Sequence, residues 1–391
     1  MRELSIYTHI PFCKSKCNYC NFYSIPLPGL KPIRNYDVFK EYGGLLIKEI
    51  ETESEKYSFA GSYVKSIYFG GGTPSIMPEN FFKEFTSYIY KNFKLSGDAE
   101  ITAEINPESA SLEKLSAFKY LGINRLSIGA QSFNDKVLKT AGRIHTAKNI
   151  FDAVNNAKKA GFKNISLDLI LGLPEQIEDI FYEDAKALLD MEPAHISAYM
   201  LSIEKGTKFY EIYSDKNKDA GFINEEKIAE YYEILCKILS EKGYDRYEIS
   251  NFAKKGYESR HNINYWKRGE YLGLGPSASS FFKLEDGKEI RKTNVSDLNS
   301  FADSILNKTN GKKTEKNSIE ILTEKDKINE EIFLSLRTAY GINAKRLYEL
   351  TGRETIDIFI NEGLMQNFKE NIILTLKGIL LSSEIFARIM V

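Results

Sequence analysis

The sequence predicts an α/β protein built on an open, partial (β/α)6 barrel, with a small winged-helix-like α+β domain at the C-terminal end. Two observations carry this prediction. Strand-like and helix-like segments alternate six times within roughly the first 210 residues. Polar or glycine-rich motifs follow these strands, and in β/α barrels the loops after the strands carry the active site. We therefore predict a barrel domain at 1–220, a connecting region at 221–300 and the C-terminal domain at 301–391.

Runs of β-branched, aromatic or alternating apolar residues predict the six strands. They are residues 3–9, 64–69, 99–105, 125–129, 164–171 and 195–201. Helices are predicted between them at 36–57, 80–93, between Ser111 and Gly122, and at 146–160 and 176–190. This alternation implies a parallel sheet with right-handed crossovers. Because a closed barrel needs eight units, six units indicate a partial barrel, and a doubly wound sheet is the alternative.

The remaining chain gives a less complete prediction. A helix is expected at 225–242 and a strand at 244–249, whereas the aromatic and glycine-rich stretch 260–282 has no clear assignment. The polar, lysine-rich stretch 297–316 predicts a surface connection. The predicted C-terminal domain comprises helices at 324–340, 343–350, 355–364 and 379–389 and a small β-wing at 371–376.

Three of the four cysteines, Cys13, Cys17 and Cys20, lie within eight residues in the spacing C-x3-C-x2-C. Thiolates this close together hold soft metal centres. The chain has no second C-x2-C pair for a four-ligand zinc site, and the spacing differs from that of ferredoxins. Three thiolates suffice for a 4Fe-4S cluster whose fourth iron stays open to a small molecule. An incomplete zinc site and a chance group of buried thiols are the alternatives, and Cys236 is expected to be a core residue.

Composition narrows the classes of function. The net charge is −1, so no bulk attraction to nucleic acid or to an anionic membrane is expected. We see no signal peptide and no apolar run of membrane-spanning length. Clustered thiols without a secretion signal predict a cytoplasmic protein whose cysteines bind metal.

Polar residues at the ends of the predicted strands form candidate ligand contacts. The glycines of the 70–74 motif GGGTP let a ligand approach the backbone, and a tight turn is the alternative. Glu104 and Asp168 end two strands, where carboxylates can hold ribose hydroxyls or an ammonium group. Gln131 and Arg143 follow another strand, and a guanidinium pairs well with a carboxylate. An ordinary surface role is the alternative for each residue alone.

The segments YTHIPFCKSKCNYCNFYS, YFGGGTPS, AEINPES, SIGAQSFND, GRIHT and DLILGLPEQ resemble the oxygen-independent coproporphyrinogen III oxidase-like branch of the radical S-adenosylmethionine (SAM) proteins. The resemblance covers essentially the whole chain and implies the radical SAM partial barrel. It implies that Cys13, Cys17 and Cys20 ligate a 4Fe-4S cluster. The SAM contacts that it implies are Tyr7, Tyr19, Gly71, Gly72, Thr73, Glu104, Gln131, Arg143 and Asp168.

Three features place the chain within that branch. The true dehydrogenases of the family carry a further cysteine where this chain has Phe22, and a longer segment before the motif than the twelve residues that precede Cys13 here. Residues 261–266, HNINYW, resemble the HNxxYW signature of the haem chaperones of this family. After Gly275, the segment PSAS departs from the GAH-type segment of many of those chaperones.

The resemblance therefore implies a cytoplasmic haem chaperone with a cluster and SAM as cofactors and haem as cargo. Its candidate haem residues are His261, Tyr265 and Trp266, the chain's only tryptophan. His9 is expected to pack beneath the cysteine loop, and no clear partner is predicted for His145 or His195.

The implied acceptors are haem-dependent proteins, with membrane-associated respiratory enzymes among the candidates, and a homodimer is left open. No catalytic residue is assigned, and coproporphyrinogen oxidase activity is not expected, although SAM cleavage stays open. The alternatives are coproporphyrinogen III dehydrogenase and a radical SAM enzyme acting on another substrate.

Overall fold

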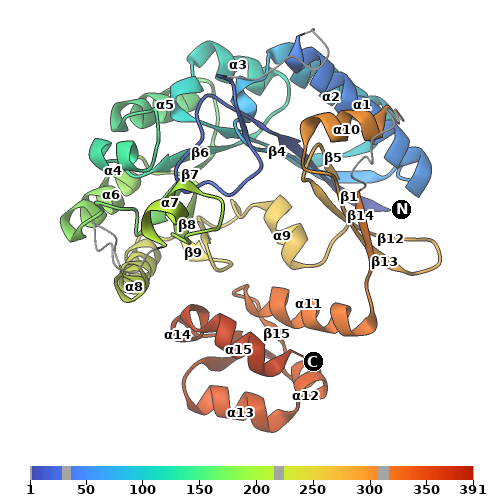
Figure 1. The fold of residues 1–391 in the computed structure, drawn as a ribbon. Coiled ribbons are helices and arrows are strands. Elements are labelled where there is room, and N and C mark those ends of the chain that lie inside the picture. The colour runs from blue at the N-terminus through green and yellow to red at the C-terminus, as the bar shows by residue number, and fades with distance from the viewer. Residues whose placement is uncertain (1, 29–36, 215–223, 307–316, 391) are drawn as a thin grey trace.

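A 12-stranded sheet forms the centre of the molecule, in the order β14-β13-β12-β11-β1-β4-β5-β6-β7-β8-β10-β9. The structure is a computed structural model that describes residues 2–28, 37–214, 224–306 and 317–390. Six adjacent strands, β1 and β4 to β8, run parallel to one another, and helices cover their outer face (Figure 1). The predicted partial (β/α)6 barrel is therefore confirmed, and the sheet extends beyond it on both sides.

The barrel elements lie close to their predicted positions. The six strands are β1 (Glu3–Ile10), β4 (Tyr63–Gly71), β5 (Lys94–Ile105), β6 (Arg125–Gln131), β7 (Asn164–Leu171) and β8 (His195–Met200). The helices between them are α1 (Val38–Tyr57), α2 (Glu79–Asn92), α3 (Leu112–Tyr120), α4 (Asp135–Thr140), α5 (Ala147–Lys159) and α6 (Glu178–Asp190). Two short 3-10 turns, η1 (Pro74–Ile76) and η2 (Pro107–Ser109), follow β4 and β5.

Apolar packing between the sheet and the outer helices fixes the strand ends. On α5, the apolar residues that recur at helical spacing, Ile150, Ala153, Val154 and Ala157, are the buried ones. On the neighbouring helices, phenylalanine rings pack edge to face, as for Phe82 against Phe69 at 5.1 Å between ring centroids. A close-packed layer of this kind holds the loops after the strands in fixed positions.

The stretch 260–282, which the sequence left unassigned, adds new strands to the sheet. It forms α9 (Arg260–Trp266), β11 (Tyr271–Leu274) and most of β12 (Ser279–Lys283). Strand β11 pairs in parallel with β1, on the side opposite β4. Consequently α9 and the strand after it lie directly beside the strand that leads into the cysteine loop.

Further strands complete the two sides of the sheet. Strands β12, β13 (Glu289–Thr293) and β14 (Ser318–Ile321) continue it in antiparallel fashion from β11. At the opposite side, α8 (Glu225–Glu241) leads to β9 (Asp245–Arg246) and β10 (Asn251–Ala253), and β10 pairs antiparallel with β8.

Two sequence predictions on the later chain are wrong. The surface connection predicted at 297–316 begins as helix α10 (Leu298–Ile305), because Leu298 and Phe301 lie on a buried apolar face and Asp297 caps the helix. The rest of that prediction, 307–316, lies outside the described residues. The single last helix predicted at 379–389 is two helices, α14 (Leu376–Leu380) and α15 (Ser382–Ile389).

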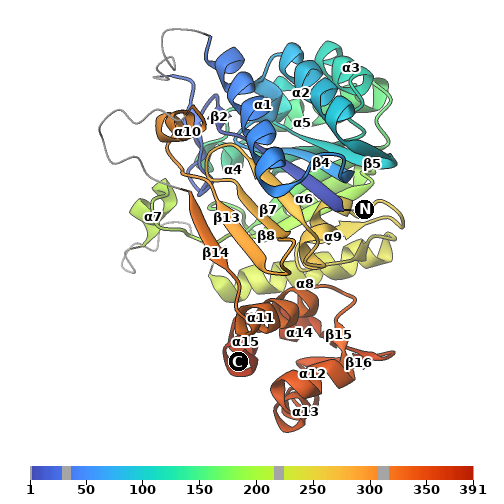
Figure 2. The ribbon, with the colours of Figure 1, turned by 90° about the vertical axis from the view of Figure 1, so that its right-hand side faces the viewer.

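The C-terminal part contains a three-stranded antiparallel sheet, β15-β17-β16, packed with helices α11 to α15 (Figure 2). Its other elements are α11 (Glu324–Leu336), β15 (Ile342–Asn343), α12 (Ala344–Thr351), α13 (Arg353–Asn361), β16 (Met365–Phe368) and β17 (Asn371–Leu374). The helices and the small β-wing match the predicted winged-helix-like arrangement. Within the described part of the chain, no helix has the length and apolar character needed to cross a membrane.

Two helical glycines allow a paired test of this packing. A Cβ atom at Gly378 would lie 1.9 Å from the carbonyl oxygen of Leu364, whereas a Cβ atom at Gly44 on α1 would meet nothing within 4 Å. We expect Gly378→Ala to lower the free energy of unfolding through backbone overlap. Gly44→Ala should raise it by about 1 kcal/mol through helix propensity. Urea denaturation of both variants checks the two signs, and equal stabilisation would contradict the close approach at Gly378.

Candidate functional site

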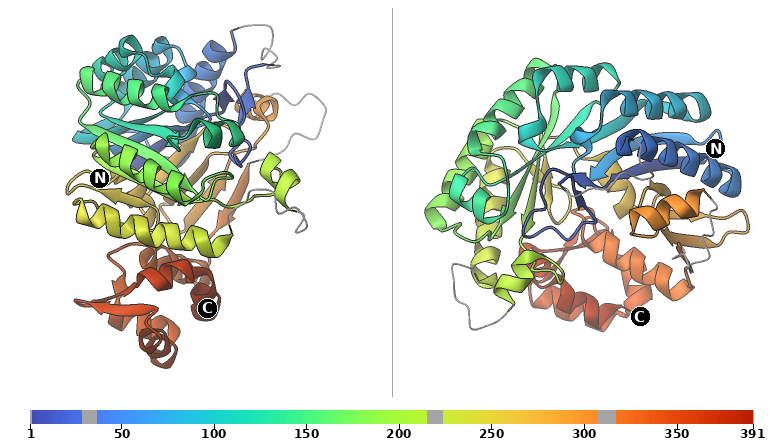
Figure 3. Two further views of the ribbon diagram at one scale, coloured as in Figure 1. Left: turned by 90° about the vertical axis from the view of Figure 1, so that its left-hand side faces the viewer. Right: turned by 45° about the horizontal axis from the view of Figure 1, so that its top comes forward.

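The cysteine loop crosses the open mouth of the barrel and is held there by backbone contacts (Figure 3). It begins with β2 (Phe12–Cys13), which pairs with β3 (Ile25–Pro26). Asn18 anchors its middle, because the Asn18 backbone N–H donates to the Ala141 carbonyl at 3.0 Å. The Asn18 carbonyl accepts from the backbone N–H of Phe209 on α7 (Lys208–Tyr213) at 2.8 Å. The loop is thus tied to segments that follow β6 and β8.

The GGGTP segment, whose first two glycines form the end of β4, contacts the cysteine loop through backbone hydrogen bonds. The backbone N–H of Gly72 donates to the Ile10 carbonyl at 2.7 Å, and that of Thr73 to the Phe12 carbonyl at 2.8 Å. A Cβ atom at position 72 would lie 2.7 Å from the Phe12 oxygen and 3.0 Å from Cys13 Sγ. Only glycine fits here, because the cysteine loop lies against the backbone of this residue.

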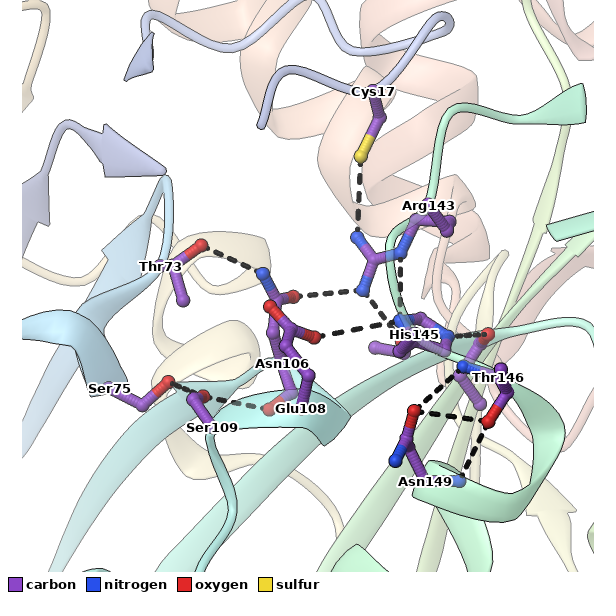
Figure 4. A network of polar contacts seen from close by, with 12 residues as sticks. Cys17, Thr73, Ser75, Asn106, Glu108, Ser109, Arg143, His145, Thr146 and Asn149 are labelled. Atoms are coloured by element: carbon purple, nitrogen blue, oxygen red, sulfur yellow. Dashed lines mark hydrogen bonds and ion pairs between the residues drawn. The ribbon is translucent and has the colours of Figure 1, made fainter. Parts of the chain in front are cut away.

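A polar network joins the loops after three strands to the cysteine loop (Figure 4). The Arg143 guanidinium donates to Cys17 Sγ at 3.4 Å, to Asn106 Oδ1 at 2.9 Å and to the Gly129 carbonyl at 3.0 Å. Asn106 in turn donates to Thr73 Oγ1 at 2.8 Å. One side chain, Arg143, therefore connects the cysteine loop to the segments that follow β4, β5 and β6.

His145 completes this network as a neutral acceptor. Its Nε2 donates to the Ala130 carbonyl at 3.2 Å, so its Nδ1 can accept from Arg143 Nε at 3.3 Å. Burial and the positive charge of Arg143 lower the pKa of His145 to about 3. Sequence reasoning found no partner for His145 and gave no role to Asn106. Asn106 directly follows β5, and this position was the signal that could have found it, whereas His145 lies between α4 and α5 and gave no such signal.

The two strand-end carboxylates lie inside the barrel with partners already in place. Glu104 accepts from the Tyr68 hydroxyl at 2.9 Å and from the Gly71 backbone N–H at 3.0 Å. Burial raises the pKa of Glu104 to about 7. Asp168 accepts from the Ser127 hydroxyl at 3.1 Å, and burial raises its pKa as well. Burial removes water from both carboxyl groups. A ligand with a cationic group or with hydroxyl groups would restore the hydrogen bonds that this water would make.

The remaining residues predicted for SAM lie around the same mouth. Gln131 has a positive φ of 69°, at a register shift between β6 and β7, and its side chain turns back towards Gly129. Tyr7 donates its hydroxyl to His9 Nδ1 at 3.0 Å, and Tyr19 packs against the Phe209 ring at 6.4 Å. Each of these positions is compatible with the prediction, which stays a prediction.

The three thiols belong to one loop but do not converge on a point. Cys13 is buried and accepts from Thr73 Oγ1 at 3.5 Å, whereas Cys17 and Cys20 are partly exposed. Burial raises the pKa of Cys13 to about 11. Among the described residues, no three His, Cys, Asp or Glu side chains are close enough to hold a single metal ion. A cubane cluster has irons at separate corners, so its three thiolates need not meet, and its positive irons would stabilise a buried thiolate.

The fourth cysteine and two further histidines lie outside the polar network around Arg143. Cys236 is on α8 and packs against the main apolar core. His9 is 4% exposed beneath the cysteine loop and donates from Nε2 to the Tyr23 carbonyl at 2.9 Å. His195, for which no partner was predicted, contacts Ser166 Oγ and the Tyr247 hydroxyl, each at 2.8 Å.

Helix α9 places the HNxxYW residues against the inner strands. His261 is 1% exposed, and its ring nitrogens contact Ser66 Oγ and the Tyr265 hydroxyl, each at 2.8 Å. Its ring also lies 5.0 Å from that of Tyr68, the donor to Glu104. Tyr265 faces a cavity on the other side, and Trp266 is not among the residues that line that cavity. The motif is thus continuous with the candidate SAM site through aromatic contacts.

This site and fold define the chain as a radical SAM protein: residues 7–188 match the model of the radical SAM superfamily. The heme chaperone HemW of Bacillus subtilis (strain 168) is 35% identical over 98% of this chain and 98% of its own length. HemW of Lactococcus lactis is 33% identical over 98% of this chain and 96% of its own length. Within the superfamily, the chain therefore belongs to the HemW family.

A solved structure supports the same fold. Coproporphyrinogen III oxidase (HemN) from Escherichia coli, described as a radical SAM enzyme, matches with a TM-score of 0.79 at 24% identity, over 100% of this chain and 90% of its own. The likeness covers the C-terminal part as well as the barrel. It concerns the fold, since identity at this level does not carry a substrate across.

The raised pKa of Glu104 predicts how stability depends on pH. The carboxyl titrates at about 7 when folded and at 4.5 in its ordinary state, so the folded chain retains its proton over that interval. Its contribution to stability is present below pH 4.5 and is lost as the pH rises towards about 7. A glutamine at this position would not titrate, so the free energy of unfolding of Glu104→Gln should increase relative to that of the wild type as the pH rises from 4.5 to about 7. Urea denaturation of both proteins at several pH values checks this, and a constant difference would contradict it.

Proposed function

We propose that the chain is a cytoplasmic haem chaperone that holds a 4Fe-4S cluster and SAM, binds haem and transfers it to haem-dependent proteins. The HemW relatives, which this chain matches over nearly their whole length, are named heme chaperones. Phe22, which occupies the place of the dehydrogenases' fourth cysteine, is 68% exposed on the cysteine loop. This supports the chaperone over coproporphyrinogen III dehydrogenase, because that position offers no thiol.

The position of α9 is the observation that carries this proposal. His261 contacts Ser66 of β4, and its ring is 6.5 Å from that of Tyr7 on β1. Strands β1 and β4 run directly into the cysteine loop and the GGGTP segment. A haem held at the HNxxYW helix would thus share its walls with the cluster and SAM site, so that one could influence the other.

The roles of individual side chains follow from their contacts. Cys13, Cys17 and Cys20 would ligate the cluster. Arg143 would orient Cys17 and face the SAM carboxylate, and Asn106 would hold the guanidinium in the orientation that this pairing needs. The other candidate SAM contacts are Tyr7, Tyr19, Gly71, Gly72, Thr73, Glu104, Gln131 and Asp168. When bound, a reduced cluster with SAM supplies radical chemistry that no side chain has.

The first test concerns the cluster. Anaerobically reconstituted protein should contain about four irons and four sulfides per chain. Cys13→Ala, Cys17→Ala or Cys20→Ala should remove the broad visible absorption of the cluster, because each removes one of three ligands. Cys236→Ala is the matched control and should keep it. Retention of the cluster in Cys17→Ala with loss in Cys236→Ala would refute the assignment.

The second test concerns SAM. Arg143→Ala removes a charge-assisted hydrogen bond and should weaken equilibrium SAM binding by about 1.5–3 kcal/mol. Because Arg143 also contacts Cys17, iron content is measured in parallel. Asp168→Asn, whose side chain keeps the size of the carboxylate, separates charge from packing. Wild-type affinity in both variants at full cluster content would remove these residues from the site.

The third test separates the chaperone from the oxidase. The wild-type protein should bind haem at about one per chain, as expected for a single HNxxYW site. With SAM and a reductant under anaerobic conditions, it should leave coproporphyrinogen III unchanged. Absorption titration and product chromatography measure the two. Formation of protoporphyrinogen IX would favour the dehydrogenase, and absence of haem binding would refute the chaperone.

A further inference from the structure

A cavity of about 280 Å3 lies beside helix α9. Its walls include the side chains of Tyr7, Tyr265, Tyr271 and Phe281. The volume is slightly below the roughly 300–1,000 Å3 common for small-molecule sites. The cavity therefore has room for one side of a flat macrocycle between aromatic walls, with the rest of the ring outside it.

His261 has no free ring nitrogen with which to reach this cavity. Ser66 Oγ donates to Ser5 Oγ at 2.8 Å, so towards His261 Nδ1, also at 2.8 Å, it acts as the acceptor. The proton of the neutral imidazole is therefore on Nδ1. The Nε2 lone pair accepts from the Tyr265 hydroxyl at 2.8 Å. A lone pair is needed to ligate iron, and the only free lone pair of the ring already accepts a hydrogen bond. His261 is therefore not available as the iron ligand.

Tyr265 is the member of the motif that faces the cavity. Its ring is partly exposed and packs edge to face against Tyr271, with ring centroids 4.5 Å apart. Its oxygen has His261 Nε2 as a hydrogen-bond acceptor, which increases the electron density on the phenol oxygen. Tyrosine is an established axial ligand of haem iron.

We propose that Tyr265 Oη ligates the iron of ferric haem and that His261 is a positioning residue that holds this oxygen. This inference rests on the haem binding proposed above and deepens it. On coordination the O–H bond breaks and the Fe–O bond forms, and the proton joins a hydroxide ion displaced from the ferric iron and leaves as water, so that the buried His261 ring stays neutral. No electron is transferred, and the iron stays ferric.

The other tyrosines of the cavity are less suited to this role. Tyr7 also donates to a histidine, His9, but it stacks on Tyr68 at 6.1 Å and lies at the SAM side of the site. Tyr271 lies beside the guanidinium of Arg291, which occupies its oxygen as a donor. Both arginines of the cavity wall pair with Glu330, Arg268 at 3.1 Å and Arg291 at 2.6 Å. The lining therefore holds two guanidinium groups against one carboxylate, so that a net charge of +1 remains beside the aromatic surfaces.

The experiment uses the full-length protein with ferric haem and records absorption and resonance Raman spectra. The wild type should show a phenolate-to-iron charge-transfer band. Tyr265→Phe, which removes one oxygen atom, should lose the band and weaken haem affinity. His261→Ala should keep the band and bind haem about 10- to 100-fold more weakly, the usual cost of losing a group that orients a ligand. His261→Gln, which restores an acceptor, should recover part of that loss.

The same spectra are recorded for a control variant and for variants of the neighbouring tyrosines. Tyr120→Phe, on a residue that is 89% exposed on α3, should match the wild type. Loss of the band in Tyr7→Phe or Tyr271→Phe but not in Tyr265→Phe would overturn the assignment. A nitrogen-ligated spectrum that disappears in His261→Ala would overturn it as well, while leaving the chaperone function intact. If the wild type bound no haem, the proposed function and this inference would both fail.

Discussion

The close approach of the cysteine loop to the end of β4 is the constraint on which the rest of the site depends. The loop carries three thiols but few apolar anchors, so backbone hydrogen bonds to Gly72 and Thr73 and the side chain of Asn18 hold it in place. Its position is then set by Arg143, whose guanidinium needs Cys17, Asn106 and the Gly129 carbonyl at once. A buried cation of this kind is stable only when its donors are satisfied.

Burial gives the interior of the barrel its chemical character. Glu104 and Asp168 lie among serine and tyrosine hydroxyls, and exclusion of water raises the pKa of both carboxyls. His145 is held neutral by the same exclusion and by Arg143. The mouth of the barrel thus offers two carboxyl groups that a cationic partner would stabilise. It also offers one fixed guanidinium that can pair with an anionic group. An amino acid cofactor presents both charges on one carbon atom.

The sequence predicted the barrel well because each strand and helix shows its own periodicity, which is a local property. It predicted the cysteine loop from spacing alone. It missed Asn106 and the partners of His145 because their roles depend on contacts between loops that are distant in sequence. It misjudged Leu298 because a short helix with polar neighbours gives a weak apolar signal. The burial of His261 was also inaccessible, since only the pairing of β11 with β1 places α9 against β4.

Strand β4 has a further consequence for how this chain tolerates change. Ser66 and Tyr68 are two residues apart, so they project from the same face of the strand, and they contact His261 and Glu104 respectively. Two residues further, Gly70 begins the segment that supports the cysteine loop. A single inserted or deleted residue upstream would turn this whole row to the outer face. The haem-side and cofactor-side contacts would then be lost together, so the length of this strand is under stricter constraint than most of its side chains.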